Sequence, residues 1–471
     1  MKASQRWQLQ QALWKRGVRV GVLEPTLAPS IATYPVMLPD DTEASDVDRK
    51  LKEIAGRMGV KSIRGAWLDN GLYSLELPRA KRQRVDYGRL ELPDDAAPLP
   101  WLLGIDNSGG VLIADVSTMP HMLIAGTTGA GKSTSVTASL AHLLTVRSPD
   151  QVQTLLLDPK QLDLVAFARL PHTVAHLTQA DVILSALESL IDEMHHRNSL
   201  FAKARVKNLA AYNAKGHTLP AIVCIIDELG LLMDTYGKAL EPILLALLQT
   251  ARASGIHLIV GTQRPDENVL KPRLRANLPT VICFAIEEGS SQHILKNKSA
   301  AGLLGAGDGL YKNKSGITRF QSPFIDDTDE RALQKVLMRA SKQPASMWTL
   351  NGVQDTSDVV QSLEGLSQID AAVLLCDRLD WINSSALIDA GVCDSDSMGK
   401  KLIRQLRKRG LVGAYDASQK ASPIRHEHDT PDTARDGHDG LVPGTVTVDS
   451  PSSTQRDGYD GLKNLRPRVV N

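Results

Sequence analysis

The chain has 471 residues, and its 54 Lys and Arg nearly balance its 53 Asp and Glu, for a formal net charge of +1. A hydrophobic fraction of 42% excludes a chain that is disordered throughout, and the length suggests about three domains. The balanced charge excludes a polybasic coat protein, so any surface that binds nucleic acid must be local. The four cysteines are scattered without metal-ligand spacing, which is typical of reduced thiols in an intracellular protein.

The sequence contains no stretch typical of a signal peptide or a membrane-spanning helix. The first residues, MKASQRWQLQQALWKRG, lack an uninterrupted apolar core. The best candidate for a membrane segment, AIVCII, is only as long as a strand, whereas a membrane helix needs about 18–20 apolar residues. We therefore expect a soluble, cytoplasmic protein that does not insert into a membrane by itself.

Residues 1–100 are expected to form a small α+β domain. The stretch SDVDRKLKEIAGRMG predicts a helix that begins at Ser45 or Asp46 and ends at Gly59. The stretch SIRGAWLDNGLYSLELP predicts two strands joined by a tight turn at Asp-Asn-Gly. The basic run KRQR at 81–84 fits either a nucleic-acid patch or a solvated edge, and the sequence favours neither.

Residues 101–342 alternate short apolar runs with amphipathic helical patterns, which predicts an α/β domain. The strand-like runs are HMLIAG, QTLLLD, AIVCIID, IHLIVGTQ and TVICFAI. Continuous apolar strands separated by helices indicate a parallel sheet that is covered on both faces. The order of the runs and the motifs at their ends predict an ATPase core.

The composition changes after this core. Residues 343–366 are polar and rich in Ser and Gln, which indicates a linker. Residues 367–418 predict three helices and a short hairpin, the pattern of a winged-helix DNA-binding domain. Residues 419–471 have few large apolar side chains and are expected to be a disordered tail. The tail repeats RDGHDGL as RDGYDGL, either by chance or as a duplicated peptide for a partner.

The segment GTTGAGKS lies between the strand-like run MLIA and the helical pattern STSVTASLAHLL. Its glycines allow consecutive backbone N–H groups to point at phosphates, and the helix N-terminus adds its positive end. Lys132 is expected to reach the β- and γ-phosphates of ATP, and Ser133 to ligate Mg²⁺. The residues expected to bind the nucleotide are Gly126, Thr127, Thr128, Gly129, Ala130, Gly131, Lys132, Ser133 and Thr134.

Two other strand ends carry polar groups suited to hydrolysis. The run AIVCIIDELG ends in Asp227, expected to hold Mg²⁺, and Glu228, expected to polarise the attacking water. A protein that only carries nucleotide needs the first carboxylate alone, so the second predicts hydrolysis. The run IHLIVGTQRP ends in Gln263, whose amide can orient water or sense the γ-phosphate. The predicted catalytic set is Lys132, Glu228 and Gln263.

Several motifs occur together in the order and spacing of one family. They are MPHMLIAGTTGAGKS, LLLDPKQLDLVAFARLPH, NLAAYN, CIIDELGLLM, ARASGIHLIVGTQRP, RANLPT and AGLLGAGDGLY. The chain resembles the FtsK/SpoIIIE DNA translocases over about residues 20–325, and less strongly over 367–412. The resemblance implies a RecA-like motor that assembles as a ring, usually a homo-hexamer, around double-stranded DNA. Asp158 and Lys160 match the family's DPK motif, and Arg252 matches its ARA motif.

Two family arginines are replaced in this sequence. Val281 stands where the family has the arginine of PTRIAF, and Gln292 where it has that of SRTIL. Ring ATPases need a cation from the neighbouring subunit at the γ-phosphate, so the identity of this arginine finger is open. The remaining candidates are Arg252, Arg264 and Arg319.

Two basic segments are candidates for DNA contact. The loop NVLKPRLRANLP carries Lys271, Arg273 and Arg275, which fit either non-specific phosphate binding or a solvated loop. The third helix of the C-terminal module is strongly basic, and the family's base-reading start NRA is SMG here. The residues expected to contact DNA from this helix are Ser397, Lys400, Lys401 and Arg404.

The sequence therefore predicts an ATP-driven translocase of double-stranded DNA. Its cargo is expected to be plasmid, phage, mobile-element or chromosomal DNA. One alternative is a coupling or packaging ATPase that works with a membrane or portal partner protein. The other is a DNA-binding regulator that ATP switches without movement, and the two missing arginines leave room for it.

Overall fold

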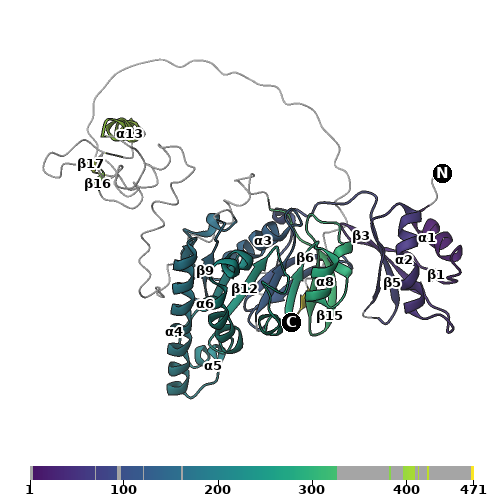
Figure 1. Cartoon of the computed structure of the whole chain (residues 1–471), viewed down its shortest axis with the longest axis horizontal. Helices are drawn as coiled ribbons and strands as arrows, with labels where there is room; N and C mark the ends of the chain where they lie inside the picture. Colours follow the sequence, from purple (N-terminus) through teal and green to yellow (C-terminus); the bar gives the residue numbers. More distant parts are fainter. Residues whose placement is uncertain are drawn as a thin grey trace, which may run out of the picture. The chain divides into compact units, whose positions relative to one another are not determined.

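The computed structural model describes residues 4–68, 70–92, 97–119, 121–160, 163–325, 381–382, 396–408, 412, 422–423 and 468–470. The chain divides into two compact units, Met1–Val353 with Asp460–Asn471, and Gln354–Tyr459 (Figure 1). Each unit is described by itself.

The N-terminal part of the first unit is a small sheet with two helices. The sheet has the order β1-β3-β5-β4, with β2 also on β3, and all of its pairs are antiparallel. Apolar side chains of both helices pack with those of β3 and β5 in one core. The elements are α1 (Gln5–Trp14), β1 (Gly21–Val22), β2 (Thr26–Leu27), β3 (Ile31–Met37), α2 (Ala44–Met58), β4 (Arg64–Trp67) and β5 (Tyr73–Pro78).

The predicted helix and hairpin of this part are confirmed, with one shift. Helix α2 begins at Ala44, one residue before the earlier of the two expected starts, because Glu43 already has the extended backbone of an N-cap. It ends where Gly59 turns left-handed, at φ 65°, as predicted. Strands β4 and β5 pair antiparallel, and the turn between them contains Asn70 and Gly71 of the predicted hairpin.

The larger sheet has the order β10-β9-β11-β12-β8-β13-β14-β15-β6-β7-β18. The neighbours from β10 to β13 are parallel, and those from β13 to β7 are antiparallel. Its strands are β6 (Pro100–Asp106), β7 (Val111–Asp115), β8 (Met122–Ala125), β9 (Val152–Leu157), β10 (Thr173–Leu177), β11 (Ala221–Ile226), β12 (Ile256–Thr262), β13 (Thr280–Cys283), β14 (Asp308–Asn313), β15 (Gly316–Gln321) and β18 (Arg468–Val470).

The large parallel sheet predicted from the sequence is confirmed, and β8, β9, β11, β12 and β13 are its five expected strands. The antiparallel extension and strand β18 were not predicted. Strand β18 pairs parallel with β7 and lies within residues 419–471, which the sequence predicts to be disordered.

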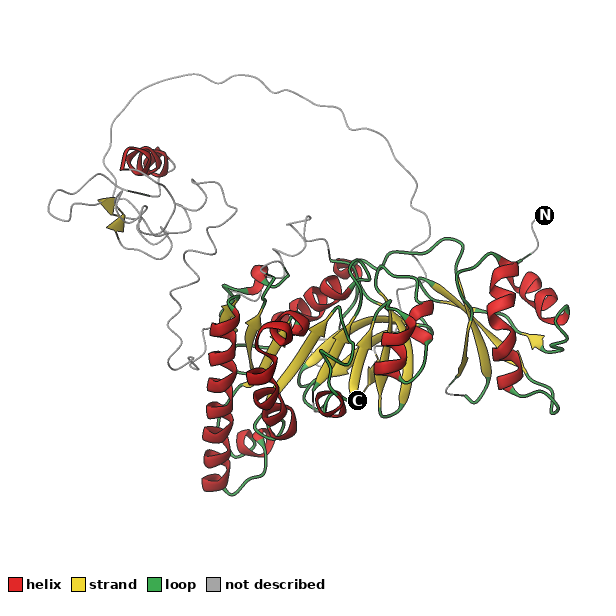
Figure 2. Cartoon of the chain, in the orientation of Figure 1, coloured by secondary structure: helices red, strands yellow, loops and turns green. Residues whose placement is uncertain are grey.

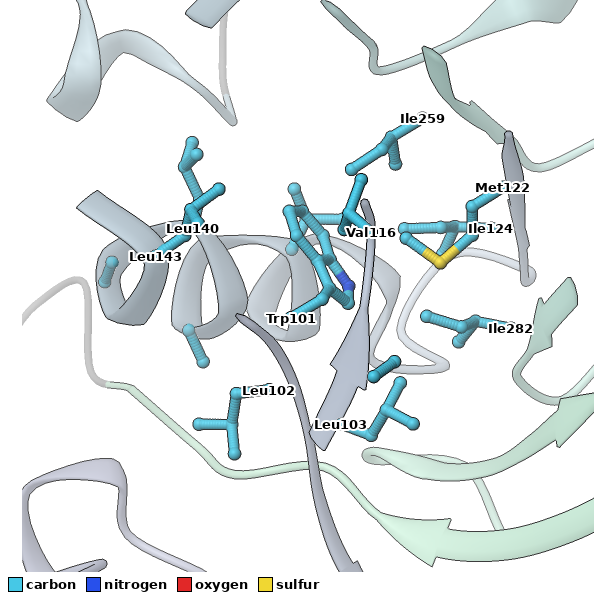
Figure 3. Close-up of a cluster of buried hydrophobic side chains, with 14 of the residues drawn as sticks. Trp101, Leu102, Leu103, Val116, Met122, Ile124, Leu140, Leu143, Ile259 and Ile282 are labelled. Carbon is cyan, nitrogen blue, oxygen red and sulfur yellow. The ribbon is translucent and has the colours of Figure 1, made fainter. Parts of the chain in front are cut away.

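Helices cover the sheet on both faces, as Figure 2 shows. Trp101, Val116 and Leu140 belong to the core between α3 and one face (Figure 3). The long helices α4 and α6 lie side by side on the other core. The helices are α3 (Lys132–Val146), α4 (Ala180–Ala204), α5 (Leu209–Asn213), α6 (Leu229–Thr250), α7 (Pro272–Ala276) and α8 (Glu288–Leu295), with 3-10 turns Tyr87–Arg89, Val165–Phe167 and Ser299–Gly302.

The described part of the second unit comprises helix α13 (Asp396–Lys408) and the antiparallel pair β16 (Trp381–Ile382) and β17 (Ser422–Pro423). Leu402 and Leu406 are buried on one side of α13. Helix α13 lies where the sequence predicts the third helix of a winged-helix module. The other two predicted helices and the linker 343–366 lie outside the described residues.

Candidate nucleotide-binding site

A cavity of about 740 Å³ lies at the carboxyl end of β8, next to the N-terminus of α3. The carboxyl ends of parallel strands are where α/β proteins bind ligands. The cavity is lined by residues 82–85, 127–129, 131–134, Lys160, Asp163, Gln263, 306–307 and 321–324.

The turn between β8 and α3 is shaped by its glycines. Gly129 and Gly131 have φ of 76° and 109°, values that favour glycine. A Cβ on Gly131 would stand 2.4 Å from the backbone nitrogen of Gly307, so a second chain segment presses on this turn. The same segment donates from the Gly307 nitrogen to the carbonyl of Ala130 at 2.9 Å.

Seven of the nine predicted nucleotide-binding residues line the cavity, and Gly126 and Ala130 do not. The nitrogen of Gly126 donates to the carbonyl of Thr262 at 3.3 Å, which ties the loop to β12. Ala130 is buried and its carbonyl faces Gly307. These two positions support the loop because their backbone groups are already bonded within the protein.

Lys132 and Asp227 form a buried ion pair. The Nζ of Lys132 donates to Oδ1 of Asp227 at 2.6 Å and to its carbonyl at 2.7 Å. Both side chains are 3% exposed. Burial raises the pKa of the Asp227 carboxyl above its usual value, and the charge and hydrogen bond of Lys132 oppose this effect.

Glu228 is held in one orientation by donors from two elements. Its carboxylate accepts from Thr262 Oγ1 at 2.9 Å, from the nitrogen of Gln263 at 3.0 Å and from Lys160 Nζ at 2.8 Å. It also accepts a hydrogen bond from the backbone nitrogen of Gly230 at 3.4 Å and so caps the N-terminus of α6. Residues at the end of β12 thus fix the Glu228 carboxylate, which follows β11. Two of its hydrogen-bond donors, Lys160 and Gln263, line the cavity.

Gln263 faces the phosphate-binding turn. Its Oε1 accepts from the hydroxyl of Thr128 at 3.0 Å, and both residues line the cavity. The structure therefore places the predicted sensor residue against the predicted phosphate loop.

The residues beside Ser133 fit a magnesium ion. Ser133 Oγ donates to Oδ2 of Asp163 at 2.5 Å. The Oδ2 of Asp227 is buried and has no hydrogen-bond partner among the described residues. Mg²⁺ binds one or two protein oxygen ligands together with water and phosphate, so an orphaned carboxylate oxygen and a hydroxyl suit it. The sequence did not single out Asp163, whose position depends on a loop held by Asp158.

The basic run at 81–84 also belongs to this cavity, which the sequence did not predict. Arg82 and Arg84 line it. The guanidinium of Arg82 donates to the carbonyl of Gly305 at 2.9 Å and to Ser30 Oγ at 3.3 Å. Its partners are distant in sequence, so no local pattern could have revealed the contact.

The chain is similar to known proteins in sequence and in fold. The family model "FtsK/SpoIIIE family" matches residues 87–220. The chain is 33% identical over 345 residues to DNA translocase FtsK of Lactococcus lactis subsp. cremoris, covering 69% of this chain and 46% of that protein. It is 29% identical over 431 residues to DNA translocase FtsK of Streptococcus pyogenes, covering 86% and 53%.

The chain belongs to the FtsK/SpoIIIE family. It spans about half the length of the curated relatives it matches. A solved structure, the pCW3 conjugation coupling protein TcpA in monomer form with ATPγS, has a similar fold at a TM-score of 0.51. The identity is 22%, and the match covers 71% of this chain and 98% of TcpA.

The two positions that lack the FtsK/SpoIIIE arginines have different surroundings. Val281 is buried within β13, and Gln292 is exposed on α8. Of the three candidate finger residues, Arg319 is 4% exposed and donates to Asp308 within its own chain, which does not favour a role at the surface. Arg264 is half-exposed and pairs with Asp234 at 2.7 Å.

Arg252 is the third candidate. Its Nη2 donates to the carbonyl of Thr118 at 2.6 Å, at an exposed position. Neither Arg252 nor Arg264 lines the cavity of its own chain. Both residues therefore lie outside this cavity.

The basic residues proposed to contact DNA differ in whether their side chains already interact with other residues of the chain. Lys271 forms an ion pair with Glu241 at 2.5 Å, and Arg275 donates to His293. Arg273 is exposed on α7, which replaces part of the expected loop by a short helix.

On α13, the three basic candidates lie on the exposed side of the helix. They are Lys400, Lys401 and Arg404. Ser397 lies in the first turn of α13, outside the residues whose side chains are described. Among the described residues, no helix has the length and apolar character needed to cross a membrane.

Proposed function

We propose that this chain hydrolyses ATP with Mg²⁺ and assembles as a homo-hexameric ring that moves double-stranded DNA. The observation that carries the proposal is the fixed carboxylate of Glu228 beside the predicted phosphate loop. Family membership supports the DNA substrate, because the relatives are named DNA translocases. The further expectation of a winged helix at 367–418 is part of this proposal.

Lys132 and the N-terminus of α3 would bind the triphosphate. The first turn of a helix offers backbone N–H groups and a partial positive charge. Lys132 now donates to Asp227, so phosphate binding would exchange one anionic partner for another. That exchange would release Asp227 toward a magnesium ion, with Ser133 as the second protein ligand. Magnesium would neutralise phosphate charge there.

Glu228 would act on the attacking water as a general base. Its two carboxylate oxygens accept hydrogen bonds from Thr262, Gln263 and Lys160, which fix the orientation of the group. The Glu228 side chain is also largely shielded from solvent. Gln263 would lie near the γ-phosphate, because its side chain contacts Thr128 of the phosphate-binding loop. A cation from a neighbouring subunit, Arg252 or Arg264, would complete the site.

The exposed cations Arg273 on α7 and Lys400, Lys401 and Arg404 on α13 are the proposed DNA contacts. Phosphate contacts of this kind make affinity depend steeply on salt. Lys271 and Arg275 would first have to leave Glu241 and His293. Arg273 is therefore the stronger candidate in that segment.

Displacement of a triplex-forming strand from duplex DNA tests the function. The wild type is expected to displace the strand with ATP, and Glu228→Gln to bind ATP and DNA without displacement. Glu228→Gln keeps the size of the side chain and its acceptor oxygen, so loss of the base is the main change. Tight DNA binding with no displacement by the wild type would contradict the proposal and favour a switched regulator.

A further inference from the structure

The nucleotide cavity has a second wall that a triphosphate does not need. One wall is the loop 127–134, whose backbone suits phosphate. The other is formed by residues 82–85 and 321–324, which also line the cavity. A nucleotide bound by its phosphates must place its sugar and base elsewhere in the same space.

The second wall is a built structure in which two distant segments are hydrogen-bonded. The nitrogen of Phe324 donates to the carbonyl of Val85 at 2.6 Å, and the nitrogen of Tyr87 donates to the carbonyl of Phe324 at 2.9 Å. These bonds form a parallel bridge between Asp86 and Phe324. The backbone of both segments is thereby fixed relative to the cavity.

Two planar groups are stacked on this wall. The guanidinium carbon of Arg84 lies 4.0 Å from the centre of the Phe324 ring. The Nε of Arg84 also pairs with Oδ1 of Asp86 at 2.5 Å, which limits rotation of the guanidinium. The Arg84 side chain is 60% exposed and lines the cavity, so its guanidinium is accessible to a bound ligand.

We propose that Arg84 and Phe324 form the nucleobase subsite of this cavity, and that it takes a purine by stacking on the Arg84 guanidinium. Arginine planes stack on nucleobases, and a larger ring gains more contact. The inference rests on the proposed use of ATP and extends it to the part of the ligand beyond the phosphates. Stacking of this kind selects purines over pyrimidines by ring area.

Calorimetric titration of three ligands tests the subsite: the imido analogues of ATP and CTP, and inorganic tripolyphosphate, each with Mg²⁺. In the wild type, the ATP analogue is expected to bind more tightly than the CTP analogue. Arg84→Ala and Phe324→Leu should each weaken the ATP analogue roughly tenfold, the scale of one base–side-chain stack. Tripolyphosphate affinity should not change in either variant.

Arg89→Ala is the matched control, because Arg89 pairs with the same Asp86 and is 64% exposed, yet does not line the cavity. It should bind all three ligands like the wild type. An equal loss for tripolyphosphate, or no loss for the ATP analogue, would overturn the subsite. A wild type that binds neither the ATP analogue nor tripolyphosphate would contradict the proposed function instead.

Discussion

Lys132 and Asp227 form a pair of opposite charges in which each side chain is 3% exposed. Removing one member of a buried pair costs more than the pair contributes, because the remaining charge loses both water and partner. Lys132 is expected to bind phosphate and Asp227 to bind the metal ion, and in the absence of both ligands each side chain neutralises the charge of the other. A ligand that supplies both charges can separate them.

Replacing Lys132 by Met tests this dependence in the protein without nucleotide. We expect the free energy of unfolding in urea at neutral pH to fall by about 3 kcal/mol, since Asp227 stays buried without its cation. Lys132→Met with Asp227→Asn should recover part of the loss, because no unpaired charge remains. A double variant less stable than Lys132→Met would contradict this account.

The loss in Lys132→Met should depend on pH. Burial raises the folded-state pKa of Asp227 above 3.8, so stability falls as pH rises through that pKa. Without Lys132 the opposing effect is gone, and the pKa rises further. The difference in stability between wild type and variant should therefore narrow as the pH falls toward 3.8. A difference that is constant with pH would show that lost packing, and not charge, causes the effect.

At the scale of elements, the strand ends explain why the site could be predicted. Strands β8, β11 and β12 are continuous apolar runs, and parallel pairing brings their ends to one edge. Strand β8 is followed by the glycine-containing turn that leads to Lys132 at the start of α3, and β11 and β12 are followed by polar residues. Lys132, Glu228 and Gln263 follow from this rule. Local patterns contain no information on partners far along the chain, so the wall formed by Arg84 and Phe324 could not be predicted. Strand β18 escaped prediction for the same reason.

The turn between β8 and α3 offers a matched pair of glycine substitutions. Gly131→Ala should weaken binding of the ATP analogue at least tenfold, because its Cβ would meet the Gly307 backbone at 2.4 Å. Gly129→Ala has a similar backbone strain, at φ 76°, but nothing lies within 4 Å of its Cβ. It should lose less affinity and less stability. Equal losses in both would show that positive φ alone, and not the contact with Gly307, constrains the turn.

At the scale of the whole first unit, buried charges join the small sheet to the large one. Arg319 on β15 donates to Asp308 at 2.8 and 2.6 Å and to Glu76 of β5 at 3.2 Å. Burial opposes the charge of Arg319, but the two carboxylates more than offset this and raise the pKa of its guanidinium. Arg64 and Asn107 also bond to Glu76, at 3.0 and 2.6 Å. The N-terminal sheet is thus anchored to the strand that leads to Phe324.

Replacing Arg319 by Met tests whether this anchor makes the two sheets unfold together. The variant leaves Asp308 and Glu76 buried with less compensation, so we expect a loss of about 3–5 kcal/mol in the free energy of unfolding. Arg49→Met, which removes an exposed pair with Asp46 on α2, should stay within about 0.5 kcal/mol of the wild type. In urea, the Arg319 variant should show separate transitions for Trp67 of the small sheet and for Trp101 of the large one. A single shared transition with the full loss of stability would mean that other contacts couple the sheets, and that Arg319 contributes stability without transmitting cooperativity.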